Sequence, residues 1–304
     1  MVEGAGSNPR VTVIIPTYNW STVLPYSIAS VLEQTYADFE LLVIGDGCTD
    51  DSADVVARCE DPRVRWHNLR ENTGNQAGPN NEGIRQAQGD VIAYLGHDDL
   101  WLRDHLSHLV HAIDNDADLV HANALFVLPS RKPYRWPTPG WRYRPGIWVP
   151  PTTVVHRRAL ADAVGGWRMP RDTGDLDAES DLWQRIVAKC GPPIRVKRVT
   201  SVKLHAGFRP GVYRQRPHHE QAYWLERIRA SAGPGGPAFP GDQRSAISVR
   251  ATVRSIRATA GLRTRLRSHR LLPTAPTVSA EERRLRDRRL KGIDEPSPHD
   301  SSSP

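Results

Sequence analysis

The chain has 304 residues, of which 38% are hydrophobic and 25% charged, so it is long enough to bury a sizeable core in one large domain or two smaller ones. Its formal net charge is +7, but residues 231–304 hold 14 Lys and Arg against 7 Asp and Glu, whereas residues 1–230 are balanced. A domain that binds nucleic acid through a uniformly basic surface does not fit this distribution, and no nucleic-acid partner is expected.

Cysteine usage and hydropathy indicate the compartment. The three cysteines, Cys48, Cys59 and Cys190, have no metal-type spacing, which predicts a reducing environment without a disulfide framework or a zinc site. The sequence shows neither a signal-sequence pattern at its start nor an apolar run that approaches the roughly 18 residues of a membrane span. We therefore expect a cytoplasmic protein, with a peripheral position on the inner face of the membrane as an option.

Apolar strands and helical patterns alternate along residues 10–115. The polar stretch Glu71–Gly83 is predicted to be a loop that leads into a helix near Ile84–Gln88. The alternation favours an α/β fold with a doubly wound, mostly parallel sheet. Strands are predicted at Val11–Asn19, from Phe39 to a Gly- and Asp-rich turn before Ser52, at Val64–Leu69 and at Val91–Leu95.

The fourth predicted strand runs into two adjacent carboxylates, Asp98 and Asp99, within YLGHDDLW (Tyr94–Trp101). A helical period then begins at once with Leu102, so the stretch reads as strand, tight acidic turn and helix. Ligands of open α/β sheets bind at the carboxyl ends of strands, and two neighbouring carboxylates there suit a hard divalent cation. An acidic cap that stabilises the following helix is the alternative interpretation.

The pattern changes after residue 115. A strand is predicted at Asp116–Leu128, a strand and a helix at Thr152–Trp167, and a helix at Glu179–Lys189. Between them, Arg131–Pro151 is dense in Pro, Gly, Trp and Arg, so it is predicted to be neither a regular helix nor a central strand. Its aromatic and arginine side chains suit contact with carbohydrate or lipid, and packing of the segment on the core is the alternative.

The composition shifts again at Ser231. Gly233–Asp242 has the composition of a linker. Beyond it, Val249, Val253, Ile256 and Ala260 share one helical stripe with arginines beside it, which suits either a helix lying on anionic lipid or a solvated or core-docked tail helix. We predict a domain over residues 1–230 and a linker with a basic, partly helical or disordered tail over residues 231–304.

Three stretches resemble a known family when they are taken together. They are VTVIIPTYN with SVLEQTYADFELLVIGDGCTDDS, then NTG…NNEGIRQAQGDVIAYLGHDDLW, then VGGW…AESDLWQRI. In this order they resemble the motifs of family-2 glycosyltransferases, over about residues 10–190. The resemblance implies the GT-A fold, with a nucleotide-sugar half at residues 10–115, an acceptor-side extension at residues 116–230 and a basic C-terminal tail.

The resemblance also implies nucleotide-binding residues. Pro16 and Tyr18 fall where the family's first strand meets the base, and Asp46 falls where a carboxylate accepts a hydrogen bond from it. An aromatic ring and an acceptor suit a flat base with ring N–H groups. Asn72 and Gly74 lie in the loop that the family places near the nucleotide.

For the chemistry, the resemblance implies a metal and a base. Asp98 falls on the position that binds Mg²⁺ or Mn²⁺ bridging the diphosphate, Asp99 is a secondary candidate, and His205 is a further candidate contact to metal or phosphate. Glu179 falls on the general base, which would take the proton of an acceptor hydroxyl. The same helix continues with three residues expected to support it or the acceptor: Asp181, Trp183 and Arg185.

Four positions depart from the family pattern. Gly96 stands at the first acidic position of the D-x-D motif, Gly45 replaces an Asp, Asn80 replaces an Arg, and Glu179 stands where Asp is usual. The function implied is metal-dependent, inverting hexosyl or related transfer from a nucleotide-diphosphate sugar to a hydroxyl of a glycan, glycolipid or secondary metabolite. The alternative is a non-catalytic nucleotide-sugar-binding domain whose tail recruits a membrane or a partner.

Overall fold

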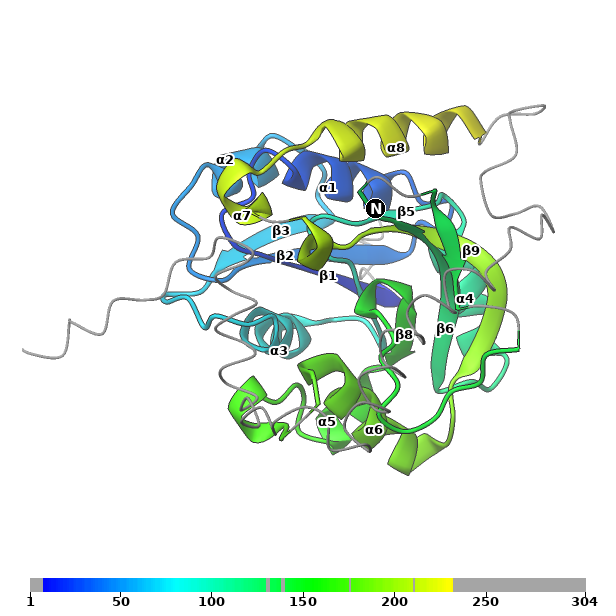
Figure 1. Cartoon of the computed structure of the whole chain (residues 1–304). Coiled ribbons are helices and arrows are strands. Elements are labelled where there is room, and N and C mark those ends of the chain that lie inside the picture. Colours follow the sequence, from blue (N-terminus) through cyan, green and yellow to red (C-terminus); the bar gives the residue numbers. More distant parts are fainter. Residues whose placement is uncertain (1–7, 130–131, 138–139, 175, 210, 232–304) are drawn as a thin grey trace, which may run out of the picture.

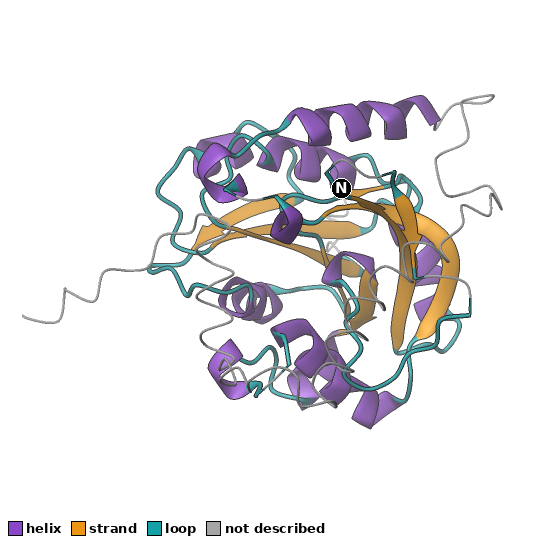
Figure 2. Cartoon of the chain, in the orientation of Figure 1, coloured by secondary structure: helices purple, strands orange, loops and turns teal. Residues whose placement is uncertain are grey.

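The computed structural model describes residues 8–231 except 130–131, 138–139, 175 and 210. The predicted linker and the amphipathic stripe of the tail lie outside the described residues. Within the described part, the strands of both predicted halves form a single mixed sheet, and helices cover its two faces (Figure 1, Figure 2).

The first half forms the parallel part of the sheet, in the order β3-β2-β1-β4. The register pairs Thr17 of β1 with Gly45 of β2, and Ile14 of β1 with Tyr94 of β4, so these strands end at one edge. This confirms the doubly wound arrangement expected from the alternation of strands and helices. The strands are β1 (Val11–Thr17), β2 (Phe39–Gly45), β3 (Val64–Asn68) and β4 (Val91–Tyr94).

The second half extends the same sheet beyond β4. Strand β8 (Val154–Arg157) runs antiparallel to β4, and β6 (Leu119–Val127) runs antiparallel to β8. Strand β9 (Ile194–Leu204) is parallel to β6 and antiparallel to the two-residue strand β5 (Leu100–Trp101). A short strand, β7 (Tyr134–Trp136), pairs with β6 off this path. The described order is β3-β2-β1-β4-β8-β6-β9-β5.

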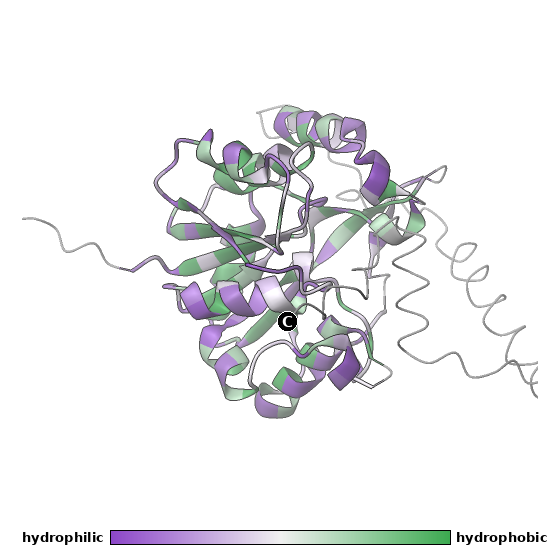
Figure 3. Cartoon of the chain, turned by 90° about the vertical axis from the view of Figure 1, so that its left-hand side faces the viewer, coloured by the Kyte–Doolittle hydropathy of each residue, from purple (hydrophilic) through white to green (hydrophobic). Residues whose placement is uncertain are grey.

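Alternating side chains of the strands fill two cores. Val13 and Ile15 of β1 enter one core, and Ile14 between them enters the other, as strand geometry requires. The first core is covered by α1 (Leu24–Leu32), α2 (Ser52–Ala57) and α4 (His105–Asp114), and the second by α3 (Ala77–Gln86), α5 (Arg158–Ala163) and α6 (Ala178–Cys190). Figure 3 shows hydrophobic residues along the strands and hydrophilic residues on the outward turns of the helices.

The helix α8 (His219–Ser231) covers a third core, made with β5, β6 and β9, and lies over α1 (Figure 1). A short helix, α7 (Val212–Gln215), precedes it. Single 3-10 turns occur at Pro151–Thr153, Pro170–Asp172 and Ala206–Phe208. Within the described residues, no helix combines the length and the apolar character that crossing a bilayer requires.

The predicted loop Glu71–Gly83 is wrong in its second part, because α3 begins at Ala77. The Gly-, Pro- and Asn-rich composition looks like a loop, but Pro79 lies in the first helical turn, where a missing N–H costs nothing. Gly83 is required by packing, since a Cβ there would come within 2.6 Å of the Ile14 side chain.

The predicted step from acidic turn directly to helix also needs correction. Leu100 and Trp101 form strand β5, paired with Val202 and Ser201 of β9, and α4 begins only at His105. The partner strand lies a hundred residues later in the sequence, so the local helical period could not reveal the pairing. Strand β9 and helix α8 were not predicted either.

Candidate functional site

Polar residues follow the carboxyl ends of three parallel strands. Tyr18 follows β1, Asp46 follows β2 and the acidic turn follows β4. The backbone N–H of Asp46 donates to the carbonyl oxygen of Thr17 at 2.8 Å, which holds the ends of β1 and β2 together. The edge is therefore the one at which open α/β sheets bind ligands.

The Asp46 carboxylate holds the predicted nucleotide loop. The backbone N–H and hydroxyl of Thr73 donate to its Oδ1 at 2.9 and 2.7 Å, and the Gly74 N–H donates to its Oδ2 at 3.2 Å. Gly74 has a φ of 72° and also donates to Oδ1 of Asn72 at 2.6 Å. The structure thus brings Asp46, Asn72 and Gly74 together, with Pro16 half-buried on β1.

Gly45 has a structural reason to lack a side chain. A Cβ at this position would come within 2.3 Å of Asn68 Oδ1 and 2.7 Å of the Trp66 ring. Asn68 in turn accepts from the backbone N–H of Cys48 at 2.8 Å and donates to its carbonyl at 2.9 Å. Side chains of β3 therefore occupy the space that the family's Asp would need.

Asp99 is the buried anchor of the acidic turn. Its side chain is 0% exposed, and its Oδ2 accepts from Lys203 Nζ at 2.7 Å and from the Thr152 hydroxyl. Its Oδ1 accepts from the backbone N–H of Leu204 at 3.0 Å. Because a buried carboxylate needs compensation, the Lys203 ammonium supplies the cation that two adjacent carboxylates require. The sequence had suggested a bound ion for this purpose.

Asp98 is the remaining carboxylate of the turn. It is 7% exposed, and its carbonyl oxygen accepts from Gln221 Nε2 of α8 at 3.3 Å. A Cβ at Gly96 would lie 2.9 Å from Asp99 Oδ2 and 3.1 Å from Asp98 Oδ1, so the two carboxylates close over the glycine.

The donor set decides what kind of cation the turn could hold. Among the described residues, no three His, Cys, Asp or Glu side chains are grouped to bind a metal ion. One carboxylate that shares an ion with substrate phosphates and water is nevertheless a common way to bind Mg²⁺, and Mn²⁺ accepts the same ligands. The residues present therefore fit a cation held jointly with a diphosphate, with Asp98 as the protein ligand.

His97, inside the turn, belongs to an aromatic cluster. Its ring stacks on Trp20 with a centroid distance of 4.5 Å and meets Tyr213 at 6.0 Å. Burial is the largest influence on this imidazole and lowers its pKa to about 4, against the opposing effect of Asp99. His97 is thus a neutral packing group that ties the acidic turn to the β1–α1 loop and α7.

Glu179 lies in the first turn of α6. Asp177 caps this helix by accepting from the Ser180 N–H at 2.7 Å. The two Glu179 oxygens accept from Trp148 Nε1 at 2.7 Å and from Gln76 Nε2 at 2.8 Å. Burial, followed by the negative charge of Asp177, raises the pKa of Glu179, and the hydrogen bond from Trp148 acts against this rise. A fixed carboxylate with a raised pKa suits a general base.

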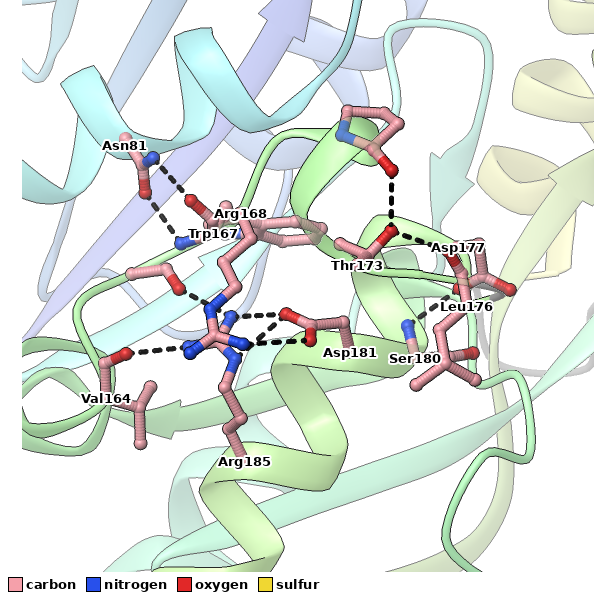
Figure 4. A network of polar contacts seen from close by, with 12 residues as sticks. Asn81, Val164, Trp167, Arg168, Thr173, Leu176, Asp177, Ser180, Asp181 and Arg185 are labelled. Atoms are coloured by element: carbon pink, nitrogen blue, oxygen red, sulfur yellow. Dashed lines mark hydrogen bonds and ion pairs between the residues drawn. The ribbon is translucent and has the colours of Figure 1, made fainter. Parts of the chain in front are cut away.

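Asp181 and Arg185 support the end of the preceding loop (Figure 4). Arg185 Nε donates to Asp181 Oδ2 at 2.8 Å, and the same guanidinium donates to the carbonyl oxygens of Val164 and Gly166 at 2.7 and 2.8 Å. Arg168 lies 3.7 Å from the other Asp181 oxygen. These two predicted residues therefore hold α6 against the loop after α5.

The same loop is held from its other side by α3 (Figure 4). Asn81 Oδ1 accepts from the Trp167 N–H at 2.8 Å, and its Nδ2 donates to the Trp167 carbonyl at 2.9 Å. Gly166, with a φ of 70°, leaves the room that Asn81 occupies. Trp183 is buried, and its indole donates to the Val149 carbonyl at 2.9 Å. The predicted helix support is thus a scaffold around α6.

Three residues of the site escaped sequence reasoning: Lys203, Trp148 and Gln76. Lys203 had a weak signal, since it is the one cation at the end of an apolar strand pattern, two residues before His205. Trp148 lies in the segment whose composition predicts no regular structure, and Gln76 lies in the stretch predicted as loop. His205 itself packs on Trp148, with ring centroids 5.7 Å apart, and on Phe208 at 5.0 Å.

Known proteins resemble this chain in amino-acid sequence. Residues 12–171, more than half of the chain, match the family model described as glycosyl transferase family 2. The chain belongs to glycosyl transferase family 2. An uncharacterized glycosyltransferase of Nostoc sp. is 37% identical over 103 residues, which are 33% of this chain and 32% of that protein. The Escherichia coli protein WfgD, named a UDP-Glc:alpha-D-GlcNAc-diphosphoundecaprenol beta-1,3-glucosyltransferase, is 33% identical over 37% of this chain and 45% of its own length.

Solved structures resemble this family-2 chain in fold. Residues 1–349 of TarS from S. aureus match 73% of this chain and 64% of that chain, with a TM-score of 0.55 and 19% identity. The mannosyltransferase PcManGT of Pyrobaculum calidifontis, in complex with GDP-Man and Mn²⁺, matches 94% of this chain and 88% of that chain, with a TM-score of 0.53 and 20% identity. The expected GT-A fold is confirmed, and the match to curated family-2 relatives covers less than half of their length.

Proposed function

We propose that this protein is an inverting glycosyltransferase that moves a sugar from a nucleotide-diphosphate donor to an acceptor hydroxyl. One observation carries the proposal. The end of β9 links the candidate base to the acidic turn: Lys203 and Leu204 donate to Asp99, and His205 packs on Trp148, whose indole donates to Glu179. A base on one side and a diphosphate-binding carboxylate on the other are what a direct displacement at a sugar carbon needs.

The proposed step is a single displacement. An acceptor oxygen attacks the anomeric carbon from the face opposite the diphosphate, forming a new C–O bond as the C–O bond to the diphosphate breaks. Glu179 takes the proton of the acceptor hydroxyl, and the hydrogen bonds from Trp148 and Gln76 keep its carboxylate aimed. A Mg²⁺ or Mn²⁺ ion held by Asp98 would supply Lewis-acid stabilisation of the leaving diphosphate.

We assign the base-binding role to Pro16, Tyr18 and Asp46, and the neighbouring loop of Asn72 and Gly74 to the nucleotide. Asp99 orients the turn through Lys203 and Thr152. His205 stays a candidate for phosphate contact. The relatives support a nucleotide-sugar donor, since TarS has been solved with UDP and with UDP-GlcNAc, and PcManGT with GDP-Man and Mn²⁺. The name of WfgD supports a bacterial glycolipid or glycan acceptor.

The test is a donor panel. Purified protein is incubated with UDP-, GDP- and dTDP-sugars and Mn²⁺ or Mg²⁺, and release of nucleotide diphosphate is followed with and without candidate acceptors. Glu179→Gln is expected to lower transfer by at least about a hundredfold, because the general base is lost. Asp98→Ala is expected to abolish it, whereas Asp54→Asn, on the exposed side of α2, is expected to leave it unchanged. Absence of turnover with every donor would refute the proposal.

A non-catalytic nucleotide-sugar-binding protein is the second candidate. It is favoured by the engagement of Asp99 with Lys203 and by Gly96, which together leave Asp98 as the one carboxylate of the turn available to a ligand. Calorimetry separates the candidates: saturable binding of a nucleotide diphosphate by a protein that shows no transfer with any donor would favour the second.

A further inference from the structure

A cluster of aromatic side chains reaches Glu179 through Trp148. The aromatic members form a continuous chain of ring contacts: Trp148 meets Phe126 at 5.9 Å and Trp136 at 5.8 Å, and Trp136 meets Trp141 at 5.6 Å. Tyr134 packs on Phe126 at 5.5 Å. We call these five residues, with the cations Lys132, Arg135, Arg142 and Arg144, the aromatic–basic wall.

The wall is joined to the candidate base by direct contact. Trp148 Nε1 donates to Glu179 Oε1 at 2.7 Å, so the ring at the end of the wall lies against the carboxylate that would activate the acceptor. A turn immediately before Trp148 is closed by the Ile147 N–H, which donates to the Arg144 carbonyl at 3.0 Å. Gly146 of this turn, at a φ of 76°, packs against Leu176 beside the start of α6.

Arg195 of β9 holds the backbone of the loop that carries the wall. Its guanidinium donates to Asn123 Oδ1 at 3.0 Å and to the carbonyl oxygens of Trp141 and Pro137 at 3.3 Å each. This cation therefore serves the loop backbone. Phe126 is the buried member of the wall, and the indoles that a ligand could reach at little cost in ordering are the half-buried ones of Trp136, Trp141 and Trp148.

The four cations of the wall differ from Arg195 in their partners, and three of them also in their exposure. Lys132, Arg142 and Arg144 are exposed, Arg135 is half-buried, and none of the four forms an ion pair with another described residue. The segment Arg131–Pro151 contains no Asp or Glu, so no acidic residue of the segment itself balances these cations. The half-buried residues Trp136, Trp141 and Trp148 are interspersed with these cations along the segment.

We propose that the wall binds the acceptor, and that the acceptor is an anionic glycan: a sugar that carries a phosphate or a carboxylate group. The flat apolar face of a sugar ring fits the indoles next to Glu179, and a guanidinium pairs with a phosphate or carboxylate through parallel hydrogen bonds. This inference rests on the proposed function and names the acceptor class for it.

The experiment uses matched acceptors and the full-length protein. Each hexose is offered as a neutral alkyl glycoside, as an alkyl glycosyl phosphate and as the corresponding uronate, with a donor that the protein turns over. Wild type is expected to prefer an anionic member of each set, and the phosphate and uronate arms identify which anion is bound. Arg142→Gln combined with Arg144→Gln is expected to raise KM for that member by at least about tenfold, because charged hydrogen bonds are lost, and to leave the neutral glycoside unchanged.

A matched control removes two exposed cations elsewhere, Arg58→Gln with Lys189→Gln, and is expected to change neither KM. Trp136→Leu is expected to raise KM for neutral and anionic acceptors alike while nucleotide binding, measured by calorimetry, stays at the wild-type value. Equal use of neutral and anionic acceptors by wild type, or an equal effect of the arginine variant on both, would overturn the anionic-acceptor proposal while transfer itself stood. Absence of turnover of every donor by the wild-type protein would instead refute the proposed function.

Discussion

The surroundings of the Glu179 side chain act in opposite directions on its pKa. Burial and Asp177 raise its pKa, whereas the Trp148 indole, by donating to the ionised carboxylate, lowers it. A general base works only when ionised, so activity is expected above the raised pKa and lost as the pH falls through it. The acidic limb of kcat/KM should therefore lie above pH 4.5, the ordinary value for this group.

Trp148→Phe tests this balance. A smaller aromatic ring remains and the hydrogen bond is lost, so the pKa of Glu179 is expected to rise further and the acidic limb of kcat/KM to move to higher pH. Trp183→Phe removes another buried indole hydrogen bond, to the Val149 carbonyl, and serves as the control that should leave the limb in place. An unmoved limb in Trp148→Phe would show that the indole does not act on the titrating group.

The Lys203–Asp99 pair makes a prediction about stability. Lys203→Met leaves a fully buried carboxylate uncompensated and is expected to lower the free energy of unfolding by about 3–5 kcal/mol. Urea denaturation measures the change, and adding Asp99→Asn to the same chain should restore much of it. Glu226→Gln, which breaks an exposed pair with Arg229 and leaves the pair of Arg229 with Glu33 in place, should cost no more than about 1 kcal/mol. Equal losses in the two single variants would contradict the prediction.

At the scale of the elements, the contact of α3 with β1 depends on a missing side chain. Gly83→Ala places a Cβ against Ile14 and is expected to destabilise the protein by about 1–3 kcal/mol through overpacking. Ile14→Ala removes the three atoms that the new Cβ would meet, so Gly83→Ala should cost much less in that background. Denaturation of both single variants and the double variant checks this, and simple additivity would refute the proposed contact.

The local sequence pattern was enough to predict the parallel strands β1, β2 and β4. The β-branched runs from Val11, Phe39 and Val91 are buried on both faces, so their hydrophobicity alone marks them. The start of α3 was missed because the apolar face of this helix is interrupted by Asn80 and Gly83, which are set by packing. Strand β5 was missed because its two residues pair with β9 across a hundred positions, which leaves no periodic signal. Strand β9 is longer, but register shifts interrupt its pairing with β6 and so its alternation.

The residues of the candidate site also fall into two groups: those that sequence motifs could nominate and those that only tertiary contacts reveal. Asp46, Asp98 and Glu179 stand in motifs with a fixed place after a strand or at a helix start, so sequence could nominate them. Lys203 and Trp148 act through tertiary contacts with residues 104 and 31 positions away, and only the folded chain shows them. The irregular segment Arg131–Pro151 suggested a carbohydrate contact from composition, and the structure adds that it touches the candidate base.

For the whole molecule, the distribution of charge predicts where a membrane would act. Residues 1–230 are balanced and residues 231–304 carry the excess of +7. Co-sedimentation with vesicles rich in anionic lipid is expected, weakening as salt is raised, and it should be lost when residues 231–304 are removed. Vesicles of neutral lipid are the control. Binding that survives the removal would place the contact elsewhere on the chain.

The pairing of Asp99 with Lys203 also constrains the order in which the protein matures. The acidic turn leaves the ribosome 104 residues before the lysine that neutralises it. Until β9 is made and inserted between β6 and β5, two adjacent carboxylates repel each other at the edge of an incomplete sheet. The strands β1 to β4 are therefore synthesised early, but the acidic turn at their edge is completed late, when a strand of high sequence separation docks.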